Sequence, residues 1–339
     1  MLFRSPLEAE EVVEEVEVKQ HNEQKKQAHI AEVVNSRLLP SLIHHLEKRD
    51  ETEDSLRIPI ALGIIQVTMH LPLATRETQA TRLLTILSQV FRSKSQDTRD
   101  LARETLCKIA ITLGPSYLPL VLRELRGALL RGPHLHVLAY VTHALLVHVT
   151  SDEHAPTFNK LDDCVNDVAH VSAEVIFGES GKDVQSEDFK TKMREVRSSA
   201  SRGLDSFAII AKHISPQKIS SLLVPIRNIL QQTETLKVMQ QVEDLLRRIA
   251  GGLNANQHLT PKDLLVLCHT LVSQNAKFLK QARKATTVHN KTAGDKFTEL
   301  KKNMTVEADH YANNSFRFAS SFFSHMSKAH CSVDLLCSA

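Results

Sequence analysis

Histidines are the residues of this chain that most readily suggest chemistry. The sequence holds 18 of them, including the neighbours His44 and His45 and a group of four, His134, His136, His143 and His148. Adjacent helical residues point about 100° apart, so His44 and His45 cannot readily share one metal ion. His136 and His143 share a helical face, but no carboxylate or thiol one turn away completes a ligand set. We therefore interpret these histidines as structural and predict no metal site.

The carboxylates and thiols also lack a catalytic arrangement. The segment Glu8–Glu17 contains six Glu and no basic residue, but acid/base catalysis needs a partly desolvated pocket, which an acidic run does not indicate. The five cysteines show no Cys-x-x-Cys or Cys/His spacing, and Cys107 and Cys268 lie in amphipathic patterns typical of small buried residues. No phosphate-binding loop, dinucleotide fingerprint, His-Glu-x-x-His or nucleophile elbow occurs. We predict no catalytic residue and no cofactor, and an enzyme hypothesis rests on the histidines alone.

Arginines provide the candidate contact residues. Arg is the residue best suited to phosphate, because its planar guanidinium donates two parallel hydrogen bonds. The candidates for RNA or partner contact are Arg99, Arg103, Arg123, Arg126 and Arg131. The alternative is that they are solvated residues with ordinary ion pairs to Glu104 and Glu124. No aromatic residues are interleaved with these arginines, so any RNA contact would involve the backbone and not the bases.

Helices must position these residues, because apolar spacing follows the helical period nearly everywhere before residue 278. The best-defined segment runs from Ser95 to Val149, where one helix is expected from Asp97, a second after Gly114-Pro115-Ser116, and a third over His134–Val149. The third is apolar almost all round and must be buried between neighbours. Further helices are expected over His29–Lys48, Leu56–Leu71, Arg76–Phe91, Leu161–Phe177, residues 189–214, 216–230 and 239–250, and from Thr260. The sequence therefore predicts an all-α chain of stacked helical hairpins.

Proline spacing favours a HEAT/armadillo-like α-solenoid. Prolines follow apolar residues at Leu39-Pro40, Leu118-Pro119 and Val224-Pro225, and the first two lie 79 residues apart. That separation is close to two repeats of about 40–47 residues each. Interior prolines would kink the outer helices, as they do in HEAT units, while Asp97 would cap the inner helix and Ala102 would allow close approach.

Charge and composition divide the chain into four segments. We expect an acidic segment at residues 1–28, helical repeats at 29–277, a basic linker at 278–310, and a truncated or atypical end at 311–339. The linker prediction rests on eight Lys or Arg between Lys277 and Lys302. Neither end has a clear capping repeat, so we expect a piece of a longer solenoid. No signal peptide or membrane span is indicated, and the net charge of +3 is too small to predict nucleic-acid binding by itself.

Several strings resemble one family of large nucleolar proteins. They include Ser55-Leu-Arg-Ile-Pro-Ile-Ala61, Arg99-Asp-Leu-Ala-Arg-Glu-Thr-Leu-Cys-Lys-Ile-Ala110 and Leu113-Gly-Pro-Ser-Tyr-Leu-Pro-Leu-Val-Leu-Arg-Glu-Leu125, with further matches at Leu130-Arg-Gly132, Phe177-Gly178, Lys192–Phe207 and Leu246-Arg-Arg-Ile249. The family is the down-regulated-in-metastasis proteins, also called component 20 of the U-three small nucleolar ribonucleoprotein. The resemblance covers about residues 30–275 and does not include the acidic start or residues 320–339.

The resemblance implies a non-catalytic HEAT-repeat scaffold of the small-subunit processome in the nucleolus. Its partners would be processome proteins, with precursor ribosomal RNA or small nucleolar RNA contacted through the backbone, and with no membrane and no small-molecule substrate. The alternative is a HEAT adaptor for nuclear transport or for phosphatase and signalling complexes. A carrier would shuttle with a small GTPase or cargo, whereas a processome subunit would stay with precursor ribosomes.

Overall fold

The computed structural model describes residues 23–48, 54–130, 132, 134–178, 194–232, 235–270 and 273. Residues 1–22 of the predicted acidic segment, the basic linker, residues 311–339 and Arg131 fall outside these residues. No strand occurs in the described part of the chain. Contacts divide the molecule into an N-terminal unit that ends at Leu113 and a C-terminal unit that begins at Gly114. This division falls within the predicted array of residues 29–277.

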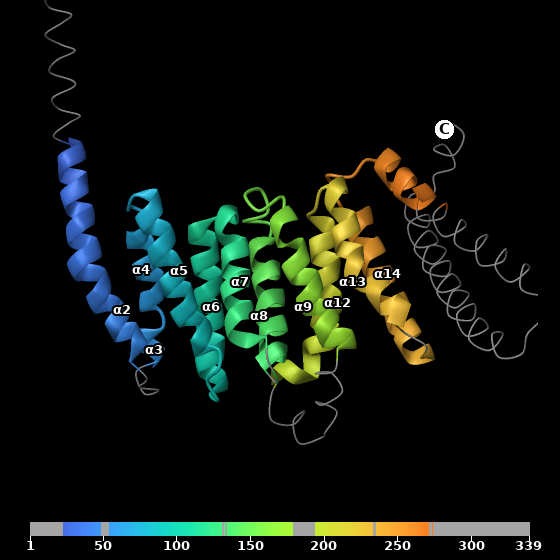
Figure 1. The fold of residues 1–339 in the computed structure, drawn as a ribbon, viewed down its shortest axis with the longest axis horizontal. Helices are drawn as coiled ribbons and strands as arrows, with labels where there is room; N and C mark the ends of the chain where they lie inside the picture. The colour runs from blue at the N-terminus through green and yellow to red at the C-terminus, as the bar shows by residue number, and fades with distance from the viewer. Residues whose placement is uncertain are drawn as a thin grey trace, which may run out of the picture. The chain divides into compact units, whose positions relative to one another are not determined.

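The N-terminal unit is built from helices that pack on their sequence neighbours (Figure 1). Residues 23–33 are helical and run into a π-helical segment, η1. Helix α4 contacts α2, α5 and α6, so its apolar face is covered from three directions, and Ile64 and Ile65 are fully buried there. The elements are η1 (Val34–Leu38), α2 (Leu39–Glu47), α3 (Asp54–Arg57), α4 (Ile60–Thr68), α5 (Leu73–Val90) and α6 (Gln96–Leu113).

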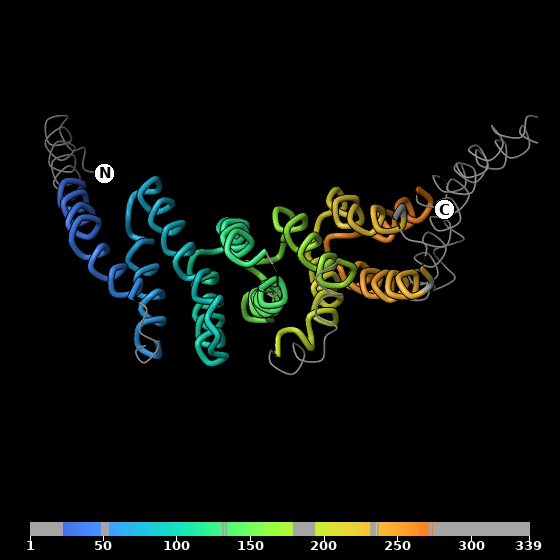
Figure 2. The backbone as a smooth tube through the Cα atoms, turned by 60° about the horizontal axis from the view of Figure 1, so that its bottom comes forward, coloured from blue at the N-terminus to red at the C-terminus, as the bar shows by residue number. Residues whose placement is uncertain are grey.

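The C-terminal unit has α12 at its centre. This helix contacts α8, α9 and α14, and Figure 2 shows α7 and α8 of the same unit as neighbouring coils in green. The short turns before three of the helices are 3₁₀ segments that begin at or near Pro or Asp. The elements are η3 (Pro115–Tyr117), α7 (Leu118–Leu129), α8 (His134–Val149), η4 (Asp162–Cys164), α9 (Val165–Phe177), α12 (Arg194–Lys212), η5 (Pro216–Lys218), α13 (Ile219–Gln232) and α14 (Leu236–Asn254).

The predicted apolar faces are confirmed. Helix α6 buries Ala102, Leu106, Ile109, Ala110 and Leu113, and α7 buries Leu118, Leu122, Leu125 and Leu129. Helix α8 has the predicted bounds and is buried on nearly every side. Helical periodicity therefore located the core correctly, because an amphipathic helix is stable in water only when its apolar face is covered.

Two glycines allow the helices of the C-terminal unit to approach closely. A Cβ at Gly203 of α12 would lie 3.1 Å from the Ser172 carbonyl oxygen of α9. A Cβ at Gly252 of α14 would lie only 2.3 Å from the Ala208 carbonyl oxygen of α12. The neighbouring Gly251 is exposed, and a Cβ there would meet nothing within 4 Å. Gly252 is therefore required by the packing of α14 on α12, whereas Gly251 is not.

The packing of α14 on α12 also corrects one sequence prediction. The helix expected over residues 239–250 was predicted to end before Gly251-Gly252, but α14 continues through both glycines to Asn254. Glycine costs about 1 kcal/mol in a helix interior, and burial of α14 against α12 offsets that cost. The end of α14 is fixed instead by Asn256, whose amide donates to the carbonyl oxygens of Ala211 and Ile214 at 2.8 Å each.

Two further sequence predictions were wrong in detail. Pro119 does not kink a helix interior, because it lies in the first turn of α7, where its missing N–H is not needed. Asp97 does not cap α6: the Ser95 hydroxyl accepts a hydrogen bond from the Thr98 amide at 3.3 Å, and Asp97 lies inside the first turn. Pro225 does lie inside α13, as predicted. The repeat-like spacing therefore predicted the helices correctly, but it did not predict correctly where every proline lies within its helix.

The described cysteines are buried and free. Burial raises the pKa of the Cys107 thiol to about 11 and that of Cys164 to about 12. Both thiols stay protonated at neutral pH and pack as apolar groups, as predicted for Cys107. Within the described residues, no single helix is both long and apolar enough to cross a membrane.

Candidate functional site

The candidate arginines of the N-terminal unit are engaged within that unit. Arg99 is buried, and its Nη1 donates to the carbonyl oxygens of Ser93, Lys94 and Ser95 at 2.9–3.2 Å. This guanidinium holds the loop between α5 and α6 and is not presented to solvent. Arg103 is partly exposed, and its Nη1 lies 2.6 Å from Asp100 Oδ1, one turn earlier on α6. Of these two, only Arg103 has exposed surface to offer a partner.

The candidate arginines of the C-terminal unit differ in exposure. The Arg123 side chain on α7 is 71% exposed, and Glu124 at 3.8 Å is its ion-pair partner. Arg126, also on α7, donates to Asp167 of α9 and therefore fastens two helices together. Its side chain is 31% exposed. Arg123 is thus the candidate whose removal would least disturb the fold.

Two histidines of α8, His136 and His143, contact α12, so they share one helical face, as their seven-residue spacing predicted. His136 is buried, and its Nδ1 lies 2.8 Å from the Ser199 hydroxyl. His143 Nδ1 lies 3.1 Å from Arg202 Nη1. A guanidinium can only donate, so His143 must accept at Nδ1. Burial, followed by the charge of Arg202, lowers the pKa of His143 and favours this neutral form.

Sequence reasoning missed a cluster of arginines on an aromatic ring. The guanidinium carbon of Arg202 lies 3.9 Å from the centroid of the Tyr140 ring, and that of Arg194 lies 5.0 Å away. Cation–π contact of this kind orients the guanidinium parallel or close to the ring face. The position of Arg194 and Arg202 on one predicted helix was visible in the sequence. The ring was not, because Tyr140 belongs to a different helix and is far away along the chain.

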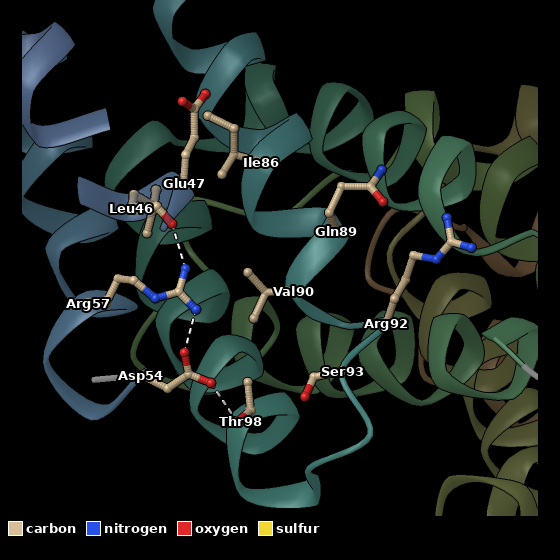
Figure 3. A pocket seen from close by; sticks show the side chains of 10 residues that line it. All are labelled: Leu46, Glu47, Asp54, Arg57, Ile86, Gln89, Val90, Arg92, Ser93 and Thr98. Atoms are coloured by element: carbon tan, nitrogen blue, oxygen red, sulfur yellow. Dashed lines mark hydrogen bonds and ion pairs between the residues drawn. The ribbon is translucent and has the colours of Figure 1, made fainter. Parts of the chain in front are cut away.

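A cavity of about 660 Å³ lies in the N-terminal unit (Figure 3). On one side Arg57 donates to the Leu46 carbonyl oxygen and to Asp54, while Thr98 donates to the other Asp54 oxygen at 2.8 Å. Both carboxylate oxygens of Asp54 are therefore occupied, and the buried ion pair joins α2, α3 and α6. The full lining is Leu46, Glu47, Asp54, Arg57, Ile86, Gln89, Val90, Arg92, Ser93 and Thr98.

This cavity does not assemble a nucleophile beside a base. Arg92 lies across the cavity from the Asp54–Arg57 pair, and the remaining polar lining consists of Glu47, Gln89, Ser93 and Thr98. Among the residues that the structure describes, no group of three or more His, Cys, Asp or Glu could hold a metal ion. The described residues contain a buried ion pair within α3, a partly exposed ion pair that joins α7 to α9, and arginines at helix surfaces.

The fold and these surfaces define an all-α protein of the helical-solenoid class, and the pairing of its helices fits a HEAT-like repeat. A family model described as the U3 small nucleolar RNA-associated protein 20 domain matches residues 47–272. The chain is 32% identical over 267 residues to U3 small nucleolar RNA-associated protein 20 of Schizosaccharomyces pombe, covering 76% of this chain and 10% of that protein. It is 33% identical over 242 residues to the protein of the same name from Saccharomyces cerevisiae, covering 71% and 10%.

The chain belongs to the U3 small nucleolar RNA-associated protein 20 family. The resemblance seen in the sequence strings is thereby confirmed, and the matched residues agree closely with the range of about 30–275 expected from them. The chain spans about a tenth of the length of the curated relatives that it matches.

Proposed function

We propose that this chain is a non-catalytic scaffold segment of the small-subunit processome. It would support processing of the precursor of small-subunit ribosomal RNA, in the nucleolus. The observation that carries the proposal is the family match over residues 47–272, since the relatives' names associate those proteins with U3 small nucleolar RNA. The fold agrees with the proposal, because stacked helical hairpins present long surfaces to protein and RNA partners.

We propose further that exposed arginines contribute to these contacts. The group named from the sequence consists of Arg99, Arg103, Arg123, Arg126 and Arg131. Burial of Arg99 and the Arg126–Asp167 ion pair favour a role in packing for those two side chains. Arg123 is the sharpest test, because its side chain is the most exposed of those described.

Affinity purification of the tagged full chain tests the scaffold function, with bound proteins and RNAs identified together. Recovery of processome proteins with precursor ribosomal RNA is the expected result. Recovery of small GTPases, transport cargo or phosphatase subunits instead would favour the adaptor alternative. A parallel purification of Arg123→Glu tests the arginine contact: weaker recovery with an unchanged circular dichroism spectrum is expected, and unchanged recovery would remove Arg123 from the interface.

A further inference from the structure

The loop between α5 and α6 carries a sequence of the kind that protein kinases recognise. Arg92-Ser93-Lys94-Ser95 places an arginine three residues before a serine, which is the spacing that basophilic serine/threonine kinases select. Such kinases hold the arginine with their own carboxylates, because a planar guanidinium pairs well with a carboxylate. Arg92 and Lys94 are exposed, and Ser95 is partly exposed. Figure 3 shows that the Arg92 side chain extends away from the buried ion pair of α3, so the motif lies at the surface of the N-terminal unit.

The same spacing occurs once more among the described residues, at Arg82-Leu-Leu-Thr85, but in a different backbone. Thr85 lies in the interior of α5, and its hydroxyl donates to the Thr81 carbonyl oxygen at 2.9 Å. Ser95 instead precedes the first residue of α6, in a loop. A kinase binds its substrate in an extended conformation, so the loop needs little local opening, whereas α5 must first lose helical turns. The structure therefore favours Ser95 over Thr85 as an acceptor.

The position of Ser95 at the start of α6 also suits a phosphate. Its hydroxyl accepts a hydrogen bond from the Thr98 amide at 3.3 Å and so caps the helix. The amides of a first helical turn have no partner within the helix, and the helix macrodipole favours negative charge beside them. A phosphate on this serine would bring more acceptor oxygens to the same amides. The modification would thus strengthen the cap and not remove it.

The charges around Ser95 do not oppose a phosphate strongly. Asp97 in the first turn of α6 is exposed, so water and salt screen its charge. Both carboxylate oxygens of Asp54 are already engaged within the N-terminal unit. The basic side chains of Arg92 and Lys94 belong to the same loop as the acceptor. A phosphate at this point would therefore be offset by nearby positive charge.

We propose that Ser95 is a phosphorylation site for a basophilic serine/threonine kinase, and that the phosphate stabilises the start of α6. In the transfer, Ser95 Oγ attacks the γ-phosphorus of ATP as the bond from that phosphorus to the β,γ-bridging oxygen breaks. ADP leaves, and the hydroxyl proton passes to the catalytic carboxylate of the kinase. The product adds about two negative charges at neutral pH. This inference does not depend on the proposed function, because it requires only the loop and α6.

Phosphorylation of the full chain by calcium/calmodulin-dependent protein kinase II with ATP tests the site, and fragmentation mass spectrometry locates the phosphate. All chains carry Thr85→Ser, so that the two candidate acceptors are both serines. Modification should be about tenfold or more faster at Ser95 than at position 85, because α5 must open locally first. Arg92→Gln should slow modification of Ser95 by about tenfold, since a charged hydrogen-bonded contact with the kinase is lost.

The matched control is Arg82→Gln. Arg82 is also exposed, its ion pair with Glu47 at 3.7 Å is exposed, and its loss removes the same charge from α5. The rate at Ser95 should equal that of the chain with Arg82 intact. Hydrogen exchange then measures the effect of the phosphate. Amides of the first turn of α6 should exchange about two- to fivefold more slowly after phosphorylation, which is the contribution expected of a negative charge at a helix N-terminus.

Equal rates at Ser95 and position 85 in the folded chain would overturn the proposed site. So would absence of phosphate at Ser95, or a rate there that Arg92→Gln does not change. Faster exchange in the first turn of α6 after phosphorylation would overturn the stabilising effect. None of these results bears on the proposed function, which is decided by the proteins and RNAs that purify with the chain.

Discussion

The packing of α14 on α12 gives the sharpest prediction about stability. Gly251 and Gly252 are adjacent in one helix, so Gly→Ala at either position gains the same helix propensity, about 1 kcal/mol. The environments differ completely. A Cβ at Gly251 meets nothing within 4 Å, whereas a Cβ at Gly252 lies 2.3 Å from the Ala208 carbonyl oxygen and 2.8 Å from Ala211 Cβ. The pair therefore isolates the cost of the close approach.

The magnitude follows from the overlap at Gly252. Carbon atoms pack best at about 3.5–4.0 Å, so α14 would have to move away from α12 by about 1 Å. Overpacking of a core costs about 1–3 kcal/mol, and the upper end applies because the obstacle is backbone. Gly252→Ala should thus lower the free energy of unfolding by about 2 kcal/mol after the gain in propensity, while Gly251→Ala raises it by up to about 1 kcal/mol.

Urea unfolding of the full chain, followed by circular dichroism, measures both changes. Hydrogen exchange of the α12 and α14 amides provides the local control, since Gly252→Ala should lower protection there and leave the N-terminal unit unchanged. Shifts of equal sign and size for the two variants would refute the reasoning, because the close helix contact would then have no energetic consequence.

Three further predictions concern buried polar groups and thiols. Asn256→Ala should lower the free energy of unfolding by about 2–4 kcal/mol, measured by urea denaturation, because its hydrogen bonds to two buried carbonyl oxygens are lost. Burial lowers the pKa of His143 and His213 below 6.5, so the unfolded chain binds more protons than the folded chain below that pH. The free energy of unfolding should therefore be highest above pH 6.5 and should fall as the pH drops through the folded pKa. His143→Gln should make this dependence on pH weaker. The raised pKa of Cys107 and Cys164 should make both thiols resist alkylation in the folded chain at neutral pH and react in urea, as mass spectrometry would detect.

The local spacing of apolar residues was sufficient to predict most of the helices of the fold. The apolar spacing from Asp97 to Val149 predicted α6, α7 and α8, and the faces that it marked are buried. One of the failures occurred where a distant neighbour changed the local preference. Gly251-Gly252 is a helix-ending pattern in isolation, but α14 continues through it, with Gly252 packed against α12.

The candidate site was less predictable, because a side chain's environment depends on contacts that sequence spacing does not encode. Arg99 and Arg123 are the same residue type at helical positions, yet one is bound to three carbonyl oxygens and the other is largely exposed. Likewise, the sequence placed Arg194 and Arg202 on one helix, but it could not predict that Tyr140 contacts both of them.

The sequence by itself determined the helical class, the core faces and the family, because periodicity and long family-like strings are local properties of the chain. Only the tertiary structure decided which arginines pack, which face solvent and where two of them meet an aromatic ring. The physical reason is that the burial and charge environment of a side chain are set by neighbouring helices. In this protein those neighbours are tens of residues away along the sequence, as Tyr140 is from Arg202.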